Sequence, residues 1–289
     1  MCKKNLRMKL VRFFFLLLIL GVLVTLDACK KMPNGGIPIY LQVDSPSVIV
    51  TATEGTPSQK VSDVWATTGA TTLGAFEMPV KIPVLAEGDV PFLLSAGIKD
   101  NGIANTRVIY PFYQPDTFTI ANAERGKTYI HHPVFRYKPN VAFALNADFE
   151  AGNGFTGISR VAKGTDSSAY DGDFGGVISL GVSDTFKAAF YTAGFTIPYT
   201  GREVYVEMNY KCDVPFTVGM SGITGTTQTN YPKIVLGAKS YWNKIYINFN
   251  TEVGTANADK YSLYFQVAKP AGQSTATIHL DNLKVVHYQ

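Results

Sequence analysis

Three segments of the sequence place tyrosines beside amide or acidic side chains in a strand-like alternation. In "REVYVEMNY", "KIYINFN" and "YSLYFQV", every second residue is apolar and would face a core, because neighbouring side chains of a strand point to opposite faces. The other face then carries Tyr205, Glu207, Tyr246, Asn248, Tyr264 and Gln266. A tyrosine ring combines a flat apolar surface with a polar tip and few rotamers to freeze. If the three strands share one concave sheet, these residues predict a platform that stacks sugar rings and bonds their hydroxyls.

A structural role is the alternative for the same face. Tyrosines on a solvated sheet face also pair across strands and add modest stability without binding anything. Trp65 and Trp242 lie within or at the head of expected strands, where packing is the favoured role.

Signatures of common catalytic sites are missing from the sequence. It contains no Gly-x-Ser-x-Gly elbow, phosphate-binding glycine loop or HExxH motif. His131 and His132 are neighbours, so in an extended strand they cannot face one metal ion. A glycosidase needs two carboxylates across a cleft, and nothing in the sequence selects such a pair. We therefore expect a protein that is not an enzyme, with a carbohydrate-active enzyme as the weakest alternative.

The segments that would position the candidate residues have the sequence pattern of β-strands. Segments rich in β-branched and aromatic residues alternate and are separated by Gly, Pro, Asn and Asp, which indicates an all-β fold. The stretch "HHPVFRYKPN", residues 131–140, holds two prolines and predicts a stiff, partly packed connector. It separates two pieces, 37–130 and 141–289, each of the size of a β-sandwich.

Each piece resembles a known kind of β-domain. The stretch "LGAFEMPVKIPVLAEGDVPFLLSAG" in 37–130 is loosely similar to PEGA-type and carboxypeptidase-regulatory-like domains, which implies a small immunoglobulin-like sandwich. In 141–289, "ALNADFEAGNGF", "SSAYDGDFGGVISL", "YWNKIYINF" and "ATIHLDNLKVVHY" follow the order seen in jelly-roll carbohydrate-binding modules and their galactose-binding-like relatives. That resemblance implies a jelly roll and is weak evidence about the ligand, because the fold hosts many functions.

The jelly-roll resemblance also implies a structural calcium site. In such modules a first-strand acid and a last-strand aspartate often share Ca²⁺ with backbone carbonyls; Glu150 and Asp281 match these positions, and Asp171 is a third candidate ligand. The ion prefers six to eight hard oxygen ligands, as this set would supply. Alternatively, these carboxylates cap turns, as Asp side chains commonly do.

The N-terminus has the features of a secretion signal. Basic residues precede the apolar run "FFFLLLILGVLVTL", whose 14 residues are too few for a permanent membrane span. The following "LDAC" resembles the cleavage site of bacterial lipoproteins, which implies removal of residues 1–28 and acylation of Cys29. Residues 29–36 would then be a lipidated tether that anchors the protein in a lipid bilayer, with a freely secreted protein as the alternative. The residues after Cys29 favour the outer membrane over the inner one and leave open the periplasmic or the cell-surface face. The protein as a whole resembles an outer-membrane lipoprotein of a Bacteroidetes-type bacterium.

Charge and cysteine content restrict the partners further. Residues 1–28 hold five basic side chains and one acidic, so the mature chain keeps 21 of the 26 Lys and Arg and 21 of the 22 Asp and Glu. Its formal charge of zero argues against a nucleic-acid partner, which requires a concentrated basic surface. Of three cysteines only Cys212 would stay free, and a buried structural role is expected for it. The sequence thus favours a non-catalytic envelope lipoprotein that binds a polysaccharide, or alternatively an adhesive one that binds another envelope protein.

Overall fold

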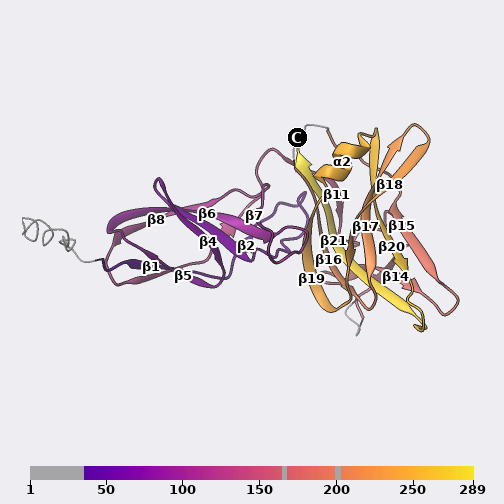
Figure 1. The fold of residues 1–289 in the computed structure, drawn as a ribbon, viewed down its shortest axis with the longest axis horizontal. Helices are drawn as coiled ribbons and strands as arrows, with labels where there is room; N and C mark the ends of the chain where they lie inside the picture. Colours follow the sequence, from indigo (N-terminus) through magenta and orange to yellow (C-terminus); the bar gives the residue numbers. More distant parts are fainter. Residues whose placement is uncertain (1–35, 165–167, 199–202) are drawn as a thin grey trace, which may run out of the picture.

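The computed structural model describes residues 36–164, 168–198 and 203–289, which form two β-sandwiches arranged end to end (Figure 1). The predicted all-β fold class is confirmed. Within the described ranges the α-helical content is one short segment, α2 (Asn250–Ala256), and no helix there is long and apolar enough to cross a membrane. The predicted signal peptide and the acylated Cys29 lie outside the described residues.

The first sandwich contains ten strands in two main sheets. One sheet has the order β5-β1-β9; the other has the order β4-β3-β6-β7, with β8 also paired to β6, and the short strands β2 and β10 pair with each other. The strands are β1 (Ile39–Val43), β2 (Ser47–Val48), β3 (Asp63–Thr68), β4 (Thr71–Glu77), β5 (Val80–Val84), β6 (Gly88–Lys99), β7 (Arg107–Ile109), β8 (Asp116–Ala123), β9 (Thr128–His131) and β10 (Val134–Phe135).

Alternation along these strands builds the first core. Leu41 of β1 and Val64 of β3 are fully buried, and Phe92 and Leu94 of β6 point to the same core. Each such side chain contributes roughly 1.5–3 kcal/mol by leaving water. The connector belongs to this sandwich, because β10 pairs in parallel with β2.

The second sandwich contains eleven strands in two sheets. We call the first the inner sheet; it has the order β13-β14-β21-β16-β19, with β11 also paired to β21. The second, the outer sheet, has the order β12-β15-β20-β17-β18. The strands are β11 (Val141–Ala147), β12 (Phe155–Thr156), β13 (Ser159–Ala162), β14 (Phe174–Leu180), β15 (Phe186–Tyr191), β16 (Val204–Cys212), β17 (Phe216–Thr224), β18 (Thr227–Leu236), β19 (Lys239–Asn248), β20 (Lys260–Ala268) and β21 (Ala276–Tyr288).

The chain crosses repeatedly between these two sheets, which is the jelly-roll arrangement that the sequence predicted. Val206 and Ile247 of the inner sheet pack in one core with Leu263 and Phe265 of the outer sheet, and all four are fully buried. These are the apolar positions of the alternation that defined the tyrosine face.

A third buried cluster joins the two sandwiches. It combines Tyr110, Phe112 and Phe135 of the first sandwich and connector with Tyr205 and Tyr246 of the inner sheet. The inner sheet therefore faces the first sandwich and the outer sheet faces away from it (Figure 1). The described chain begins at the end of the first sandwich that is farthest from the second (Figure 1).

Candidate functional site

The predicted tyrosine platform does not form as one surface. Strands β16 and β19 are neighbours, with Glu207 opposite Tyr246 and Tyr205 opposite Asn248, as the platform requires. Strand β20, which carries Tyr264 and Gln266, belongs to the outer sheet instead. The condition that all three strands share one sheet is therefore not met, and the platform hypothesis fails on it. The alternation along one strand shows which side chains share a face but not which of the two sheets of a sandwich the strand joins.

The inner-sheet half of the predicted platform is buried. Tyr205 is 3% exposed and Tyr246 is 2% exposed, because aromatic side chains of the first sandwich cover them. The ring of Tyr110 lies 5.6 Å from that of Tyr205 and 4.9 Å from that of Tyr246, centroid to centroid. The structure thus uses these tyrosines for domain docking and leaves them no surface for a sugar ring.

Glu207 is the polar centre of this docking surface. Its Oε1 accepts hydrogen bonds of 2.6 Å from the Tyr110 hydroxyl and 2.7 Å from the Tyr137 hydroxyl, and its Oε2 lies 3.1 Å from Nζ of Lys244. Burial would raise the pKa of Glu207, but the positive charges of Lys244 and Lys284 and the two hydroxyls lower it below its ordinary value. The carboxylate is therefore ionised at neutral pH, inside the joint.

Burial and the negative charge of Glu207 raise the pKa of Tyr110 and of Tyr137 well above the usual value of a tyrosine. Both hydroxyl groups therefore stay protonated and act as hydrogen-bond donors. Polar contacts across the joint extend outward from this centre. Lys284 of β21 donates a 2.8 Å hydrogen bond to the Thr56 carbonyl, and Ser58 donates one of 2.7 Å to the Asn209 side chain. The joint is packed and hydrogen-bonded on both sides, which makes it a fixed connection.

The burial of the joint residues also concerns the alternative of an adhesive protein. An exposed apolar patch at the joint would have favoured the adhesive role, but Phe135 and Tyr137 there are only 0% and 5% exposed. Both side chains are part of the docking core.

The three predicted calcium ligands accept backbone N–H groups. Oε1 of Glu150 accepts 2.9 Å bonds from Asp173 and Phe174, and Oδ2 of Asp281 accepts bonds from Tyr170 (2.8 Å) and Asp171 (3.2 Å). Asp171 itself caps Gly172.

Burial raises the pKa of Asp281 to about 6, and the backbone N–H groups oppose this rise. Among the described residues, no group of three or more His, Cys, Asp or Glu side chains is arranged to hold a metal ion. The turn-capping alternative describes the contacts observed. Calcium binding stays a prediction, tested by the melting temperature with calcium and with chelator.

The uncovered face of the outer sheet carries the remaining predicted residues. Cross-strand pairing sets Phe190, Tyr264, Gly219 and Pro232 in one row across β15, β20, β17 and β18. The Tyr264 ring stacks on Phe190 at 5.5 Å and lies across Gly219, where an added Cβ would come 2.3 Å from the ring. Tyr264 is only 1% exposed, so it forms the floor of this row and the half-buried Phe190 presents the accessible ring.

Hydrogen-bonding side chains border this aromatic row on both sides. Gln266 lies opposite Thr217 on one side. On the other side Ser221 donates a 2.7 Å bond to the exposed Asn230, and Gln228 donates to Ser221 at 3.2 Å. We call this surface the outer face. Sequence reasoning missed Phe190, Asn230 and Gln228, because the strands that carry them lack a repeated tyrosine pattern.

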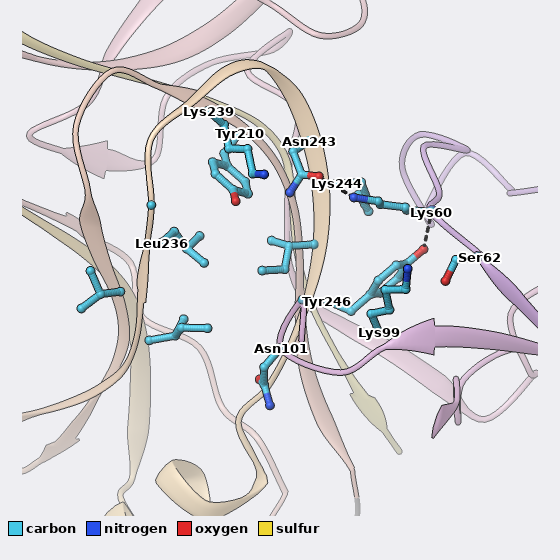
Figure 2. Close-up of a pocket in the computed structure, with 15 residues that line it drawn as sticks. Lys60, Ser62, Lys99, Asn101, Tyr210, Leu236, Lys239, Asn243, Lys244 and Tyr246 are labelled. Atoms are coloured by element: carbon cyan, nitrogen blue, oxygen red, sulfur yellow. Dashed lines mark hydrogen bonds between the residues drawn. The ribbon is translucent and has the colours of Figure 1, made fainter. Parts of the chain in front are cut away.

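A cavity of about 260 Å³ lies at the seam between the sandwiches (Figure 2). Figure 2 shows Lys60, Ser62 and Lys99 reaching it from the first sandwich, with Lys239 and Asn243 on the facing side of the second. Sequence reasoning could not have found it, since its lysines, from Lys60 to Lys244, are far apart in the sequence and line one cavity only when the domains dock.

No protein-family model matches this sequence, and no similar sequence was found among curated proteins. Solved structures of carbohydrate-binding modules are similar to about half of the chain. The C-terminal family 22 module of Clostridium thermocellum Xyn10B has 13% identity and a TM-score of 0.35, over 52% of this chain and 97% of that one. A family 61 module in complex with β-1,4-galactotriose has 14% identity and a TM-score of 0.33, over 49% of this chain and 94% of that one. A family 29 module variant complexed with cellulohexaose has 12% identity and a TM-score of 0.34, over 52% of this chain and 92% of that one.

Proposed function

We propose that this protein is a non-catalytic envelope lipoprotein, anchored in the outer membrane through acylated Cys29, that binds glycan on the outer face of its second sandwich. One observation carries the glycan part of the proposal. The outer face is the side of the second sandwich that the first leaves uncovered, and there an aromatic row is bordered by amides and hydroxyls. Such a row suits a sugar ring, which has apolar C–H faces and a hydroxyl rim.

The exposure of the side chains on the outer face suggests which of them would contact the sugar. Phe190 would stack on the sugar, with Tyr264 beneath it as support, and Gln266, Asn230 and Gln228 would bond the sugar hydroxyls. This assignment keeps Tyr264 and Gln266 of the original hypothesis and replaces Tyr205, Tyr246, Glu207 and Asn248, which serve the joint.

The arrangement of the molecule supports the anchoring part. A tether on Cys29 would enter at the end of the first sandwich farthest from the second (Figure 1). The first sandwich would then act as a fixed spacer that holds the outer face away from the lipid, since the joint is packed and hydrogen-bonded. Incorporation of labelled palmitate in the wild type and its absence in Cys29→Ala tests the anchor.

A glycan-array screen of the full chain in detergent tests the binding. We expect specific binding to one glycan class that the Phe190→Ala/Gln266→Ala double variant loses while its melting temperature changes little. Tyr170→Ala, which removes an exposed ring outside this face, is the control and should bind normally. Silence on a broad array, or equal binding by the double variant, would contradict the proposal.

A further inference from the structure

The seam cavity collects positive charge that the carboxylates of the described residues neutralise only in part. Four lysines line it, Lys60, Lys99, Lys239 and Lys244, and no Asp or Glu is among the described residues that do so. Two of them have carboxylate partners outside the cavity: Lys244 contacts Glu207 at 3.1 Å, and Lys99 contacts Glu77 at 3.4 Å. Lys60 and Lys239 form no ion pair with any carboxylate of the described residues.

The two remaining lysines approach from opposite domains. Nζ of Lys60, on the first sandwich, donates to the side chain of Asn243 (Figure 2). Nζ of Lys239, at the start of β19, lies 3.3 Å from the Tyr241 hydroxyl. Partial desolvation and the charges of Lys239 and Lys99 lower the pKa of Lys60. Bringing an anion between the two would relieve this repulsion, since each ammonium group would gain an opposite charge.

The rest of the cavity offers what the neutral part of a sugar needs. Side-chain amides of Asn101 and Asn243 and the hydroxyl of Ser62 can bond hydroxyl groups, and Leu236 and the ring of Tyr210 supply apolar surface. The volume of the cavity lies just below the roughly 300–1,000 Å³ of ordinary small-molecule pockets, so it has room for one sugar unit.

We infer that this seam cavity binds an acidic sugar unit, whose carboxylate or sulfate group lies between Lys60 and Lys239 and whose hydroxyls meet Asn101, Asn243 and Ser62. The site is separate from the outer face, because its walls come from both sandwiches and it opens at their seam. Its acidic-sugar specificity requires domain docking, since neither sandwich carries both unpaired lysines.

Titration calorimetry of the full chain in detergent, with tetragalacturonate as probe, tests the inference. We expect saturable binding that weakens with added salt, and at least about tenfold weaker binding of the methyl-esterified probe, which lacks the charge. The Lys60→Gln/Lys239→Gln variant should also bind about tenfold or more weakly. Lys81→Gln/Lys163→Gln, which removes two exposed lysines elsewhere, should bind within about twofold of the wild type.

Several results would overturn the inference. Equal binding of the charged and esterified probes would remove the anion requirement, and equal losses in both double variants would show only non-specific charge attraction. Sodium sulfate binding as tightly as tetragalacturonate would assign the cavity to small inorganic anions. Melting temperatures confirm that each variant is folded; if Lys60→Gln/Lys239→Gln is not, the single variant Lys239→Gln replaces it. Array binding of neutral glycans, measured on the same variants, reports on the outer face independently.

Discussion

The hydroxyl of Tyr110 in the first sandwich donates a 2.6 Å hydrogen bond to the buried carboxylate of Glu207 in the second. This contact assigns the inner-sheet tyrosines to domain docking. A charged group is costly to bury unless it is paired and hydrogen-bonded, and here both domains supply the partners. The two sandwiches are therefore expected to unfold together, and the outer face keeps a fixed position relative to the N-terminal end.

Removing the Glu207 charge should weaken the joint. In Glu207→Gln, Lys244 and Lys284 lose their buried counter-charge, so we expect the free energy of unfolding to fall by about 3–5 kcal/mol in urea titrations. Glu124→Gln, which removes an exposed ion-pair partner of Lys127, should cost less than about 1 kcal/mol. Equal losses in the two variants would show that Glu207 does not hold the domains together.

Tyr246→Ala separates docking from glycan binding. We expect a loss of about 3–5 kcal/mol in stability, because a fully buried ring is replaced by a cavity. Glycan binding at the outer face should persist in the variant below its lowered melting temperature. Tyr241→Ala, on the same strand but with a side chain that is 61% exposed in the wild type, is the matched control and should stay within about 0.5 kcal/mol. Loss of glycan binding by a folded Tyr246→Ala protein would show that the outer face does not bind the glycan independently of the joint.

Asp281 makes the free energy of unfolding depend on pH, and the raised pKa of its carboxyl group fixes the direction of the change. Burial raises the pKa of its carboxyl group from an ordinary value near 3.8 to about 6, so between these pH values the native state holds a proton that the unfolded chain has released. The contribution of Asp281 to the free energy of unfolding therefore falls by up to about 3 kcal/mol as the pH rises from 3.8 to about 6. Asp281→Asn cannot titrate, so the stability difference between variant and wild type should shift in the variant's favour from pH 4 to pH 7. A difference that does not change with pH would refute the assignment.

Gly219 makes room for the ring that supports the outer face. In Gly219→Ala the new Cβ would lie 2.3 Å from the Tyr264 ring, which must move, and overpacking of this kind costs about 1–3 kcal/mol. We expect that loss in urea unfolding, together with weaker glycan binding as Phe190 loses its stacked partner. Gly237→Ala meets no atom within 4 Å and should change stability by less than about 0.5 kcal/mol.

The local sequence pattern was sufficient to predict which side chains of an individual strand face the core. The positions predicted to face the core in β16, β19 and β20 do so, because the two-residue period of a strand fixes which side chains share a face. The same period cannot tell what covers the opposite face. Tyr205 and Tyr264 look alike in sequence, yet one is covered by another domain and the other by Phe190 within its own sheet.

The sequence by itself determined the all-β class, the jelly-roll resemblance of the second piece and the absence of net charge once residues 1–28 are set aside. These depend on composition and on short-range alternation. Only the tertiary structure decided that Glu207 is a docking group, that Phe190 and Asn230 belong to one surface, and that Lys60 and Lys239 line one cavity. The physical reason is that each of these relations joins residues from different strands or domains, and contacts of that kind follow from sheet order and domain packing, which leave no local signal in the chain.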